Sequence, residues 1–261
     1  MQWNLSGKNA LVGGSSKGIG KATAIALAEL GANVTLVSRS ADIMGDVIKL
    51  LHKTPGQDHD FLVADFTDTK DLHTKVSALV SEKNIHILVN NTAGPPAGPI
   101  TDAAARDFLQ AFNNHLICNH LLAQAVLPGM KRDNYGRIIN IISTSVKAPL
   151  VGLGVSNTVR GAVASWAKTM ANELGRFQIT VNNVLPGLTL TDRLHDLIER
   201  QAAESGKSVE EVARAMQSSV PMGRFAQPAE IAAAVAFLAS PAASYINGVN
   251  LPVDGGRTRS L

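Results

Sequence analysis

The chain has 261 residues, of which 45% are hydrophobic and 17% are charged. This balance is typical of a globular protein and excludes a disordered chain. The single cysteine excludes a disulfide framework and a cysteine-based zinc site, and it fits a reducing compartment. The formal net charge of +3 is small and the cations are scattered, so nucleic-acid binding is not expected.

Short apolar runs alternate with longer helical patterns along the chain. The runs predict buried strands over residues 8–14, 33–37, 60–64, 86–89, 137–142, 179–184 and 248–251. The helical patterns cover residues 18–30, 41–51, 70–81, 103–131, 156–174, 192–218 and 228–239. This alternation predicts an α/β fold: a doubly wound parallel sheet of the Rossmann type with helices on both faces, in one domain over residues 1–261.

No apolar run reaches the roughly 18 residues of a membrane span, and the first ten residues lack the pattern of a signal peptide. We therefore expect a cytoplasmic protein that does not bind a membrane. His115 and His120 lie five positions apart and do not share a helix face, so no metal site is expected.

A glycine-rich turn follows the first predicted strand, with the sequence GGSSKGIG over residues 13–20. Between a strand and a helix, glycines let the backbone approach a pyrophosphate, and the helix N-terminus offers free N–H groups. A tight turn without a ligand is the less favoured alternative. The turn predicts a dinucleotide-binding site that includes Gly14, Ser16, Lys17, Gly18, Ile19 and Gly20.

The end of the second strand indicates which dinucleotide is bound. About 20 residues beyond the glycine run, an acid would bind the ribose 2′-OH of NAD, whereas an arginine would accommodate the 2′-phosphate of NADP. This chain has Arg39 there, between Ser38 and Ser40, and no acid before Asp42. With Lys17 as a second cation, the pattern favours NADP(H) over NAD.

These motifs, with Asp65, NNTAG at residues 90–94, Pro186-Gly187 with Thr191, and VDGG at residues 253–256, resemble the short-chain dehydrogenase/reductase family over about residues 5–256. Within that family the sequence is similar to 3-oxoacyl-acyl-carrier-protein reductases. The resemblance implies further cofactor contacts: Asp65 and Phe66 beside the adenine, then Asn91, Thr92 and Ala93 along the ribose side, and Pro186, Gly187, Thr189 and Thr191 at the nicotinamide and pyrophosphate. Gly13 departs from the family's usual threonine, and the NNTAG motif is one residue longer than usual.

The family's catalytic residues are a serine, a tyrosine and a lysine, with an asparagine on the preceding helix. Ser143 matches the serine. At the tyrosine position stands Ser156, and one helical turn later, at the lysine position, stands Arg160. His115 falls where the asparagine is expected. The two tyrosines of the chain, Tyr135 and Tyr245, lie elsewhere and are not placed to donate a proton to a substrate.

The substitutes differ in the chemistry that they can perform. Ser156 is a poor acid without assistance, and Arg160 supplies charge and hydrogen-bond donors but does not lose its own proton. Arg160 could also bind the nicotinamide ribose. Only His115 has an unperturbed pKa, about 6.5, that suits proton transfer near neutrality. His115 could equally be a structural helix residue, and Ser156 could mark lost activity.

We therefore hypothesise an NADPH-dependent oxidoreductase that reduces a carbonyl or 3-oxoacyl-type small molecule with an altered set of proton donors. The polar helical segment 191–218 would be its substrate lid. The main alternative is a catalytically impaired homologue that binds NADP as a binding or partner subunit, and non-redox chemistry is a third. By resemblance, a homo-oligomer, a dimer or a tetramer, is expected.

Overall fold

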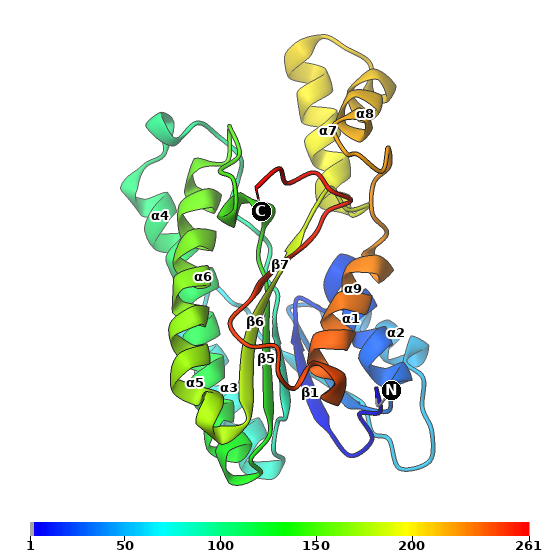
Figure 1. The fold of residues 1–261 in the computed structure, drawn as a ribbon, viewed down its shortest axis with the longest axis vertical. Helices are drawn as coiled ribbons and strands as arrows, with labels where there is room; N and C mark the ends of the chain where they lie inside the picture. Colours follow the sequence, from blue (N-terminus) through cyan, green and yellow to red (C-terminus); the bar gives the residue numbers. More distant parts are fainter. Residues whose placement is uncertain (1–2, 261) are drawn as a thin grey trace.

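The computed structural model describes residues 3–260. Its strands form one parallel sheet in the order β3-β2-β1-β4-β5-β6-β7 (Figure 1). The strands are β1 Asn9–Gly13, β2 Asn33–Ser38, β3 Asp60–Val63, β4 Ile87–Asn90, β5 Gly136–Ile141, β6 Ile179–Pro186 and β7 Asn250–Val253. Strand order reverses at β1 and β4, which is the topological switch point of a doubly wound fold. The predicted fold class is confirmed.

Helices cover both faces of the sheet (Figure 1). On one face lie α1 Gly18–Glu29, α2 Ala41–Leu50 and α9 Pro228–Ala239, which share one apolar core with the strands. On the other face lie α3 Thr69–Glu82, α5 Cys118–Arg132 and α6 Gly154–Leu174, which share a second core. The five inner strands are buried on both sides, which accounts for their nearly continuous apolar sequences, whereas the edge strands β3 and β7 are partly exposed.

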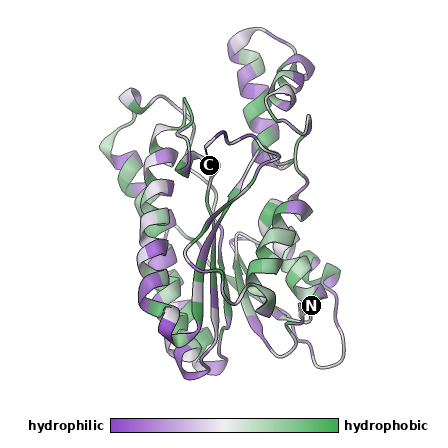
Figure 2. Ribbon diagram, in the orientation of Figure 1, coloured by the Kyte–Doolittle hydropathy of each residue, from purple (hydrophilic) through white to green (hydrophobic). Residues whose placement is uncertain are grey.

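Two predicted helices differ from the structure. The stretch 103–131 divides into α4 Ala105–Phe112, a π-helical turn η2 Asn113–Ile117, and α5. The stretch 192–218 divides into α7 Asp192–Ser205 and α8 Val209–Ser218 because Gly206 adopts a left-handed conformation (φ 68°) that ends α7. The helical pair α7–α8 projects beyond the sheet with its own small core, and its residues alternate between hydrophobic and hydrophilic (Figure 2).

Four short 3-10 turns complete the helical segments within residues 3–260. They are η1 Ile100–Asp102, η3 Thr144–Val146, η4 Gly175–Phe177 and η5 Pro241–Ala243. Among them, η3 directly follows β5, and the side chain of its N-cap residue Ser143 accepts a hydrogen bond from the backbone N–H of Ser145. This turn therefore fixes the backbone at the position of the predicted catalytic serine.

A ladder of asparagine side chains crosses the four strands β4, β5, β6 and β7. Asn90 donates to Asn140 (2.8 Å), Asn140 donates to Asn183 (2.8 Å), and Asn183 donates to Asn250 (2.7 Å). The first three side chains are buried, and each pair also lies directly opposite in the sheet register. Buried amides are costly unless they are paired, so the ladder specifies the alignment of β4, β5, β6 and β7.

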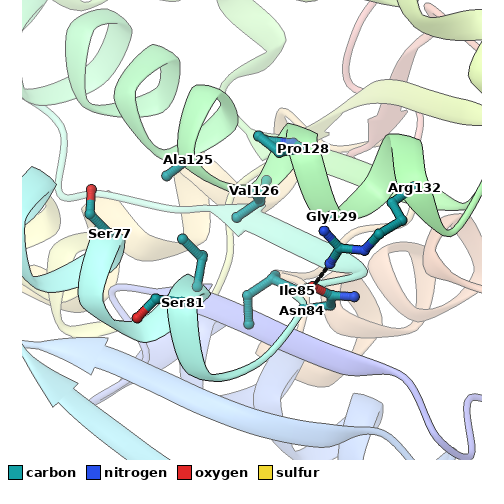
Figure 3. Close-up of a pocket in the computed structure, with 10 residues that line it drawn as sticks. Ser77, Ser81, Asn84, Ile85, Ala125, Val126, Pro128, Gly129 and Arg132 are labelled. Carbon is teal, nitrogen blue, oxygen red and sulfur yellow. Dashed lines mark hydrogen bonds between the residues drawn. The ribbon is translucent and has the colours of Figure 1, made fainter.

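A small cavity of about 180 Å³ lies at the amino-terminal edge of the sheet, between α3 and α5 (Figure 3). Arg132 donates there to the side chain of Asn84, which in turn donates to Asp133. Ser77, Ser81, Ala125 and other small or apolar side chains form the rest of its wall. None of the predicted site residues lines this cavity, so the candidate site must lie at the opposite edge.

Candidate functional site

A much larger cavity of about 1220 Å³ opens at the carboxyl ends of the strands. Parallel α/β sheets bind their ligands at this edge, next to the switch point. All residues predicted for cofactor binding or catalysis line the cavity, except Gly18 and Gly20. The structure therefore gathers into one space residues that are spread from Gly14 to Thr191 in the sequence.

The glycine-rich turn is packed so closely that side chains would not fit. Gly14 has φ 58°, and a Cβ atom there would lie 2.5 Å from the Asn91 carbonyl oxygen. A Cβ atom on Gly20 would lie 2.2 Å from the Gly14 carbonyl oxygen. Gly20 therefore lets the start of α1 pack directly against Gly14, although Gly20 does not line the cavity.

The N-terminus of α1 is left open toward the cavity. Lys17 is the N-cap residue and makes no side-chain cap, and the first turn of the helix has no acidic residue. Because the first N–H groups of a helix have no partner within the helix, they remain available to an anion. A close-packed glycine turn leading into an uncapped helix fits the pyrophosphate of a dinucleotide.

The side chain of Asn91 holds the end of β1 and the glycine turn at Gly13, where a threonine is usual in the family. Its side-chain amide donates to the carbonyl oxygens of Gly13 (3.2 Å) and Gly14 (3.3 Å). A Cβ atom on Gly13 would lie 3.1 Å from the ring of Phe66 and 3.2 Å from the Asn91 carbonyl oxygen. The glycine therefore lets the strand-four motif and the Phe66 ring pack directly on β1.

Arg39 lies exposed at the end of β2, and within residues 3–260 it forms no salt bridge or side-chain hydrogen bond. Its charge contributes to lowering the pKa of Asp65, after the larger effect of a hydrogen bond from the Thr67 backbone. Ser38 is buried and accepts from the Ser40 backbone N–H (3.3 Å). This leaves the guanidinium available to a phosphate beside the predicted adenosine site.

Lys17 has a partner that the sequence did not predict. Its ammonium lies 2.6 Å from a carboxylate oxygen of Asp192, the first residue of α7, and both side chains are largely exposed. The hydrogen bond from Lys17, followed by its charge, lowers the pKa of Asp192. The pair therefore links the phosphate-side turn to the base of the α7–α8 pair.

His115 is buried (2% exposed) in the π-helical turn η2. Its Nδ1 lies 2.6 Å from the Thr92 hydroxyl oxygen. Burial, followed by the charges of Arg160 and Arg193, lowers its pKa to about 2. The expectation of a pKa near 6.5 is therefore wrong, because the imidazole is shielded from water and faces two cations. At neutral pH it is uncharged and can hydrogen-bond without acting as an imidazolium acid.

Arg160 is buried (8% exposed) on α6 and donates from Nη1 to the Ile141 carbonyl oxygen (3.0 Å). Burial and the charge of Arg193 lower its pKa to about 10, so it stays cationic at neutral pH. Ser143 accepts from the Ser145 N–H (3.1 Å), which leaves its own hydroxyl hydrogen free. Ser156 is buried, lines the same cavity and has no side-chain hydrogen bond within residues 3–260.

The sequence prediction missed Arg193 on α7. Its guanidinium donates to the carbonyl oxygens of Gly94 (2.9 Å) and Pro95 (3.2 Å), which belong to the loop after β4. It lies exposed at the cavity mouth. Its place directly after Thr191-Asp192 was the only sequence signal. The cavity also includes side chains that no motif indicated: Asp102, Asp107, Gln110, Asn114, Leu153, Leu197 and Arg257.

Neither tyrosine lines the cavity. The Tyr135 hydroxyl donates to the Ala239 carbonyl oxygen (3.1 Å), and its ring lies under the ammonium of Lys8. Tyr245 is fully exposed beyond the lining residues. Cys118 is buried and donates to the Phe66 carbonyl oxygen, and burial raises its pKa to about 12, so the thiol is not nucleophilic.

The fold and the cavity define a dinucleotide-binding α/β protein, and the family model of enoyl-(acyl carrier protein) reductase matches residues 14–258. The chain therefore belongs to the short-chain dehydrogenase/reductase family, whose members matched here are oxidoreductases. It is 35% identical over 256 residues to the 3-oxoacyl-[acyl-carrier-protein] reductase FabG of Vibrio harveyi, covering 97% of this chain and 98% of that protein.

Two further comparisons concern proteins described with NADPH. The NADPH-dependent reductase BacG of Bacillus subtilis is 29% identical over 262 residues, with 98% of this chain and 100% of that protein covered. A crystal structure of L-sorbose reductase from Gluconobacter frateurii complexed with NADPH and L-sorbose superposes with a TM-score of 0.93 at 30% identity, covering 100% of both chains.

The part of the chain that the structure describes contains neither a membrane-spanning helix nor a cluster of metal ligands. None of the helices within residues 3–260 is both long and apolar enough to cross a membrane. Over the same residues, no group of three or more His, Cys, Asp or Glu side chains is arranged to hold a metal ion.

Proposed function

We propose that this protein is an NADP(H)-dependent oxidoreductase that reduces a carbonyl group of a small molecule, with proton donors that differ from those of its family. The observation that carries this proposal is the single cavity that joins the uncapped glycine turn to the buried polar group of Ser143, Ser156, Arg160 and His115. A dinucleotide that spans this cavity places its two ends at these two sets of residues.

The cofactor would be held by the residues already described. The N-terminus of α1 would bind the pyrophosphate, and the free guanidinium of Arg39 would bind a 2′-phosphate. Asp65 and Phe66 line the cavity and would contact the adenine, and Asn91, Thr92 and Ala93 line it too and would contact the ribose. The relatives described with NADPH support the choice of NADP(H) over NAD(H).

NADPH, when bound, supplies a hydride to the carbonyl carbon. The carbonyl oxygen then gains negative charge and must receive a proton to give the alcohol. Arg160 is a buried cation that lines the same cavity, and it would stabilise the developing charge. The proton would come from the free hydroxyl of Ser156 or Ser143, replenished by water in the space that a tyrosine side chain occupies in the family.

His115 would serve this site as a neutral hydrogen-bonding group. Its low pKa prevents it from carrying the proton as an imidazolium ion, but a neutral imidazole can accept on one nitrogen and donate from the other. The Thr92 hydroxyl on Nδ1 fixes the ring orientation. We therefore assign His115 a place in a hydrogen-bonded relay between Thr92 and the cavity.

The helical pair α7–α8 would be the substrate lid over residues 191–218. Its apolar residues Leu194 and Leu197 line the cavity, and Arg193 and Asp192 tie its base to the loop after β4 and to the glycine turn. A lid of this kind would exclude water from the reacting carbonyl.

We also propose that the protein works as a cytoplasmic homo-oligomer, a dimer or a tetramer. Exposed apolar side chains support the assembly: Leu109 on α4, Ile117 at the end of η2, and Tyr245 before β7. Paired long helices would cover such positions. Light scattering tests this proposal, and a monomer at micromolar concentration would contradict it.

The test of the function has two stages. NADPH is first titrated by fluorescence, and its oxidation is then followed with a panel of aldehydes, ketones, quinones and acyl thioesters. We expect NADPH to bind in the first stage and to be oxidised with at least one carbonyl class in the second. Ser156→Ala and His115→Asn should then lower kcat with little change in the dissociation constant of NADPH. Unchanged rates would remove these residues from the mechanism.

One observation favours a second candidate, which is a non-catalytic NADP-binding or partner subunit. Ser156 and Arg160 stand where the sequence predicts the family's tyrosine and lysine, and neither tyrosine of the chain lines the cavity. Tight NADPH binding without turnover over the whole panel would favour this candidate. A complete lack of binding would exclude both.

A further inference from the structure

The reaction end of the cavity carries positive charge that no protein group neutralises. Within residues 3–260, neither Arg160 nor Arg193 forms a salt bridge with a carboxylate. Arg160 donates one hydrogen bond, to the carbonyl oxygen of Ile141, and Arg193 donates only to the carbonyl oxygens of Gly94 and Pro95. A guanidinium has five N–H donors, so both retain unused hydrogen-bonding capacity.

The two arginines and His115 line the same cavity, and the charge of each arginine acts on a neighbour in it. Arg193 lowers the pKa of Arg160, and both lower the pKa of His115. They come from different parts of the chain, since Arg160 lies on α6 and Arg193 lies on α7, and both side chains line the cavity. Like charges held together across an open space form an arrangement that a bound anion would stabilise.

Within residues 3–260, none of the three carboxylates that line the cavity forms a salt bridge with Arg160 or Arg193. Asp107 is occupied at the start of α4, where it accepts from the Ala104 backbone N–H (2.9 Å). Asp102 accepts from the hydroxyl of Thr101 (3.0 Å). Asp65 lies at the opposite end of the cavity, beside Arg39. The cation pair is therefore left for a ligand to neutralise.

We propose that the substrate carries a carboxylate next to the reacting carbonyl, and that this carboxylate binds between Arg160 and Arg193. Planar guanidinium groups match carboxylates through paired, charge-assisted hydrogen bonds. The neutral imidazole of His115 adds a third hydrogen-bonding group on the same wall. The inference rests on the proposed function and narrows its substrate class to oxo acids, as distinct from neutral ketones and thioesters.

The test compares matched acids and esters. Acetoacetate with methyl acetoacetate, and 2-oxobutanoate with methyl 2-oxobutanoate, are titrated calorimetrically into the complex with NADP+, and their reduction by NADPH is measured separately. We expect the better acid to bind about 100-fold more tightly than its ester, about tenfold for each guanidinium. Equal affinity for acid and ester in both pairs would overturn the proposal.

Variants locate the anion site. Arg193→Gln should lower the acid-to-ester affinity ratio about tenfold, since its contact is partly open to solvent. Arg214→Gln is the matched control, because Arg214 is an exposed arginine on α8 outside the cavity lining, and it should keep the wild-type ratio. Arg160→Gln should lower the ratio further. If that variant fails to fold, Arg193→Gln still decides, and an unchanged ratio there would refute the proposal.

The two proposals fail in different ways. Acid-selective binding without reduction of any acid leaves the anion site in place and removes the redox function. Reduction of carbonyl compounds with no acid preference leaves the redox function in place and removes the anion site.

Discussion

The two ends of the large cavity are built differently. At the cofactor end, the determinants are mainly backbone: a glycine turn too close-packed for side chains, an uncapped helix and the amide of Asn91 on two carbonyl oxygens. At the reaction end, the determinants are buried side chains, Ser156, Arg160 and His115, on helices that the rest of the fold holds in place.

This difference would let the reaction end depart from the family, as we propose, while the cofactor end keeps the family's pattern. The cofactor end depends on close contacts of the backbone, and a new side chain there would displace the turn or β4. At the reaction end, a residue can change while the helix that carries it stays packed on the sheet. The chemistry of the site can therefore diverge on an unchanged cofactor-binding frame.

The asparagine ladder aligns β4, β5, β6 and β7, and breaking it should have the largest effect on the free energy of unfolding. Asn140→Leu removes the partner of both Asn90 and Asn183. Each of these buried amides then loses one hydrogen-bond partner, and the two losses together should cost about 4 kcal/mol of the free energy of unfolding. Urea denaturation measures this. Asn250→Leu removes one partner only and should cost about half as much, and equal costs would show that the ladder does not act through pairing.

The cofactor end should tolerate almost no added volume. Gly20→Ala places a methyl group 2.2 Å from the Gly14 carbonyl oxygen, so the turn must shift. We expect the dissociation constant of NADPH to rise at least about 100-fold, or about 2.7 kcal/mol. Gly45→Ala is the matched control, since its Cβ atom would meet nothing within 4 Å on α2. It should leave binding unchanged, and loss of binding in both variants would contradict the account.

Arg39 should determine the preference between cofactors. Arg39→Gln removes a free guanidinium beside the predicted 2′-phosphate position, and one charge-assisted hydrogen bond contributes about 1.5–3 kcal/mol. The ratio of NADPH to NADH affinity should fall about 30-fold, with most of the change in NADPH. Lys49→Gln, at an exposed position on α2, serves as the control. A ratio that stays constant would mean that the 2′-phosphate is bound elsewhere.

The reaction end should make folding stability depend on pH through His115. Its folded pKa of about 2 lies below the unfolded value near 6.5, so the unfolded chain binds the proton more tightly between these values. The contribution of neutral His115 to the free energy of unfolding is complete above about pH 6.5. As the pH falls below about 6.5, it decreases by about 1.4 kcal/mol per pH unit.

Denaturation of the wild type and His115→Asn at pH 7.5, 6.5 and 5.5 checks this. The variant should lose less free energy of unfolding than the wild type between the last two values. His73→Asn, at an exposed position on α3, should behave as the wild type. Parallel curves for wild type and His115→Asn would show that the imidazole titrates normally in the folded protein.

Much of the fold could be predicted because buried parallel strands have continuous apolar sequences, and glycines mark the first turn. The π-helical turn at Asn113–Ile117 could not, since it interrupts a helical pattern that is continuous in sequence. The ladder was also missed, although Asn90, Asn140 and Asn183 are visible in the sequence, because only the strand register places them side by side.

The electrostatics of the site were the least predictable part. The prediction located His115 by counting along the helix, but its pKa depends on burial and on two arginines. One of these, Arg193, meets the loop after β4 across 99 positions of sequence. Local patterns carry no information about such a contact, whereas the glycine turn is marked by residues that lie close together in sequence.

The central claim is our proposal that the site transfers hydride with Ser156 and Arg160 at the positions where we predict the family's tyrosine and lysine. Its most direct test is the fate of deuterium at C4 of NADPH, supplied separately on each face, during incubation with the protein and a carbonyl compound that oxidises NADPH. The account predicts one alcohol per NADPH consumed, with deuterium on the carbinol carbon from one face only. Tight NADPH binding with no alcohol formed from any carbonyl compound of the panel would contradict it.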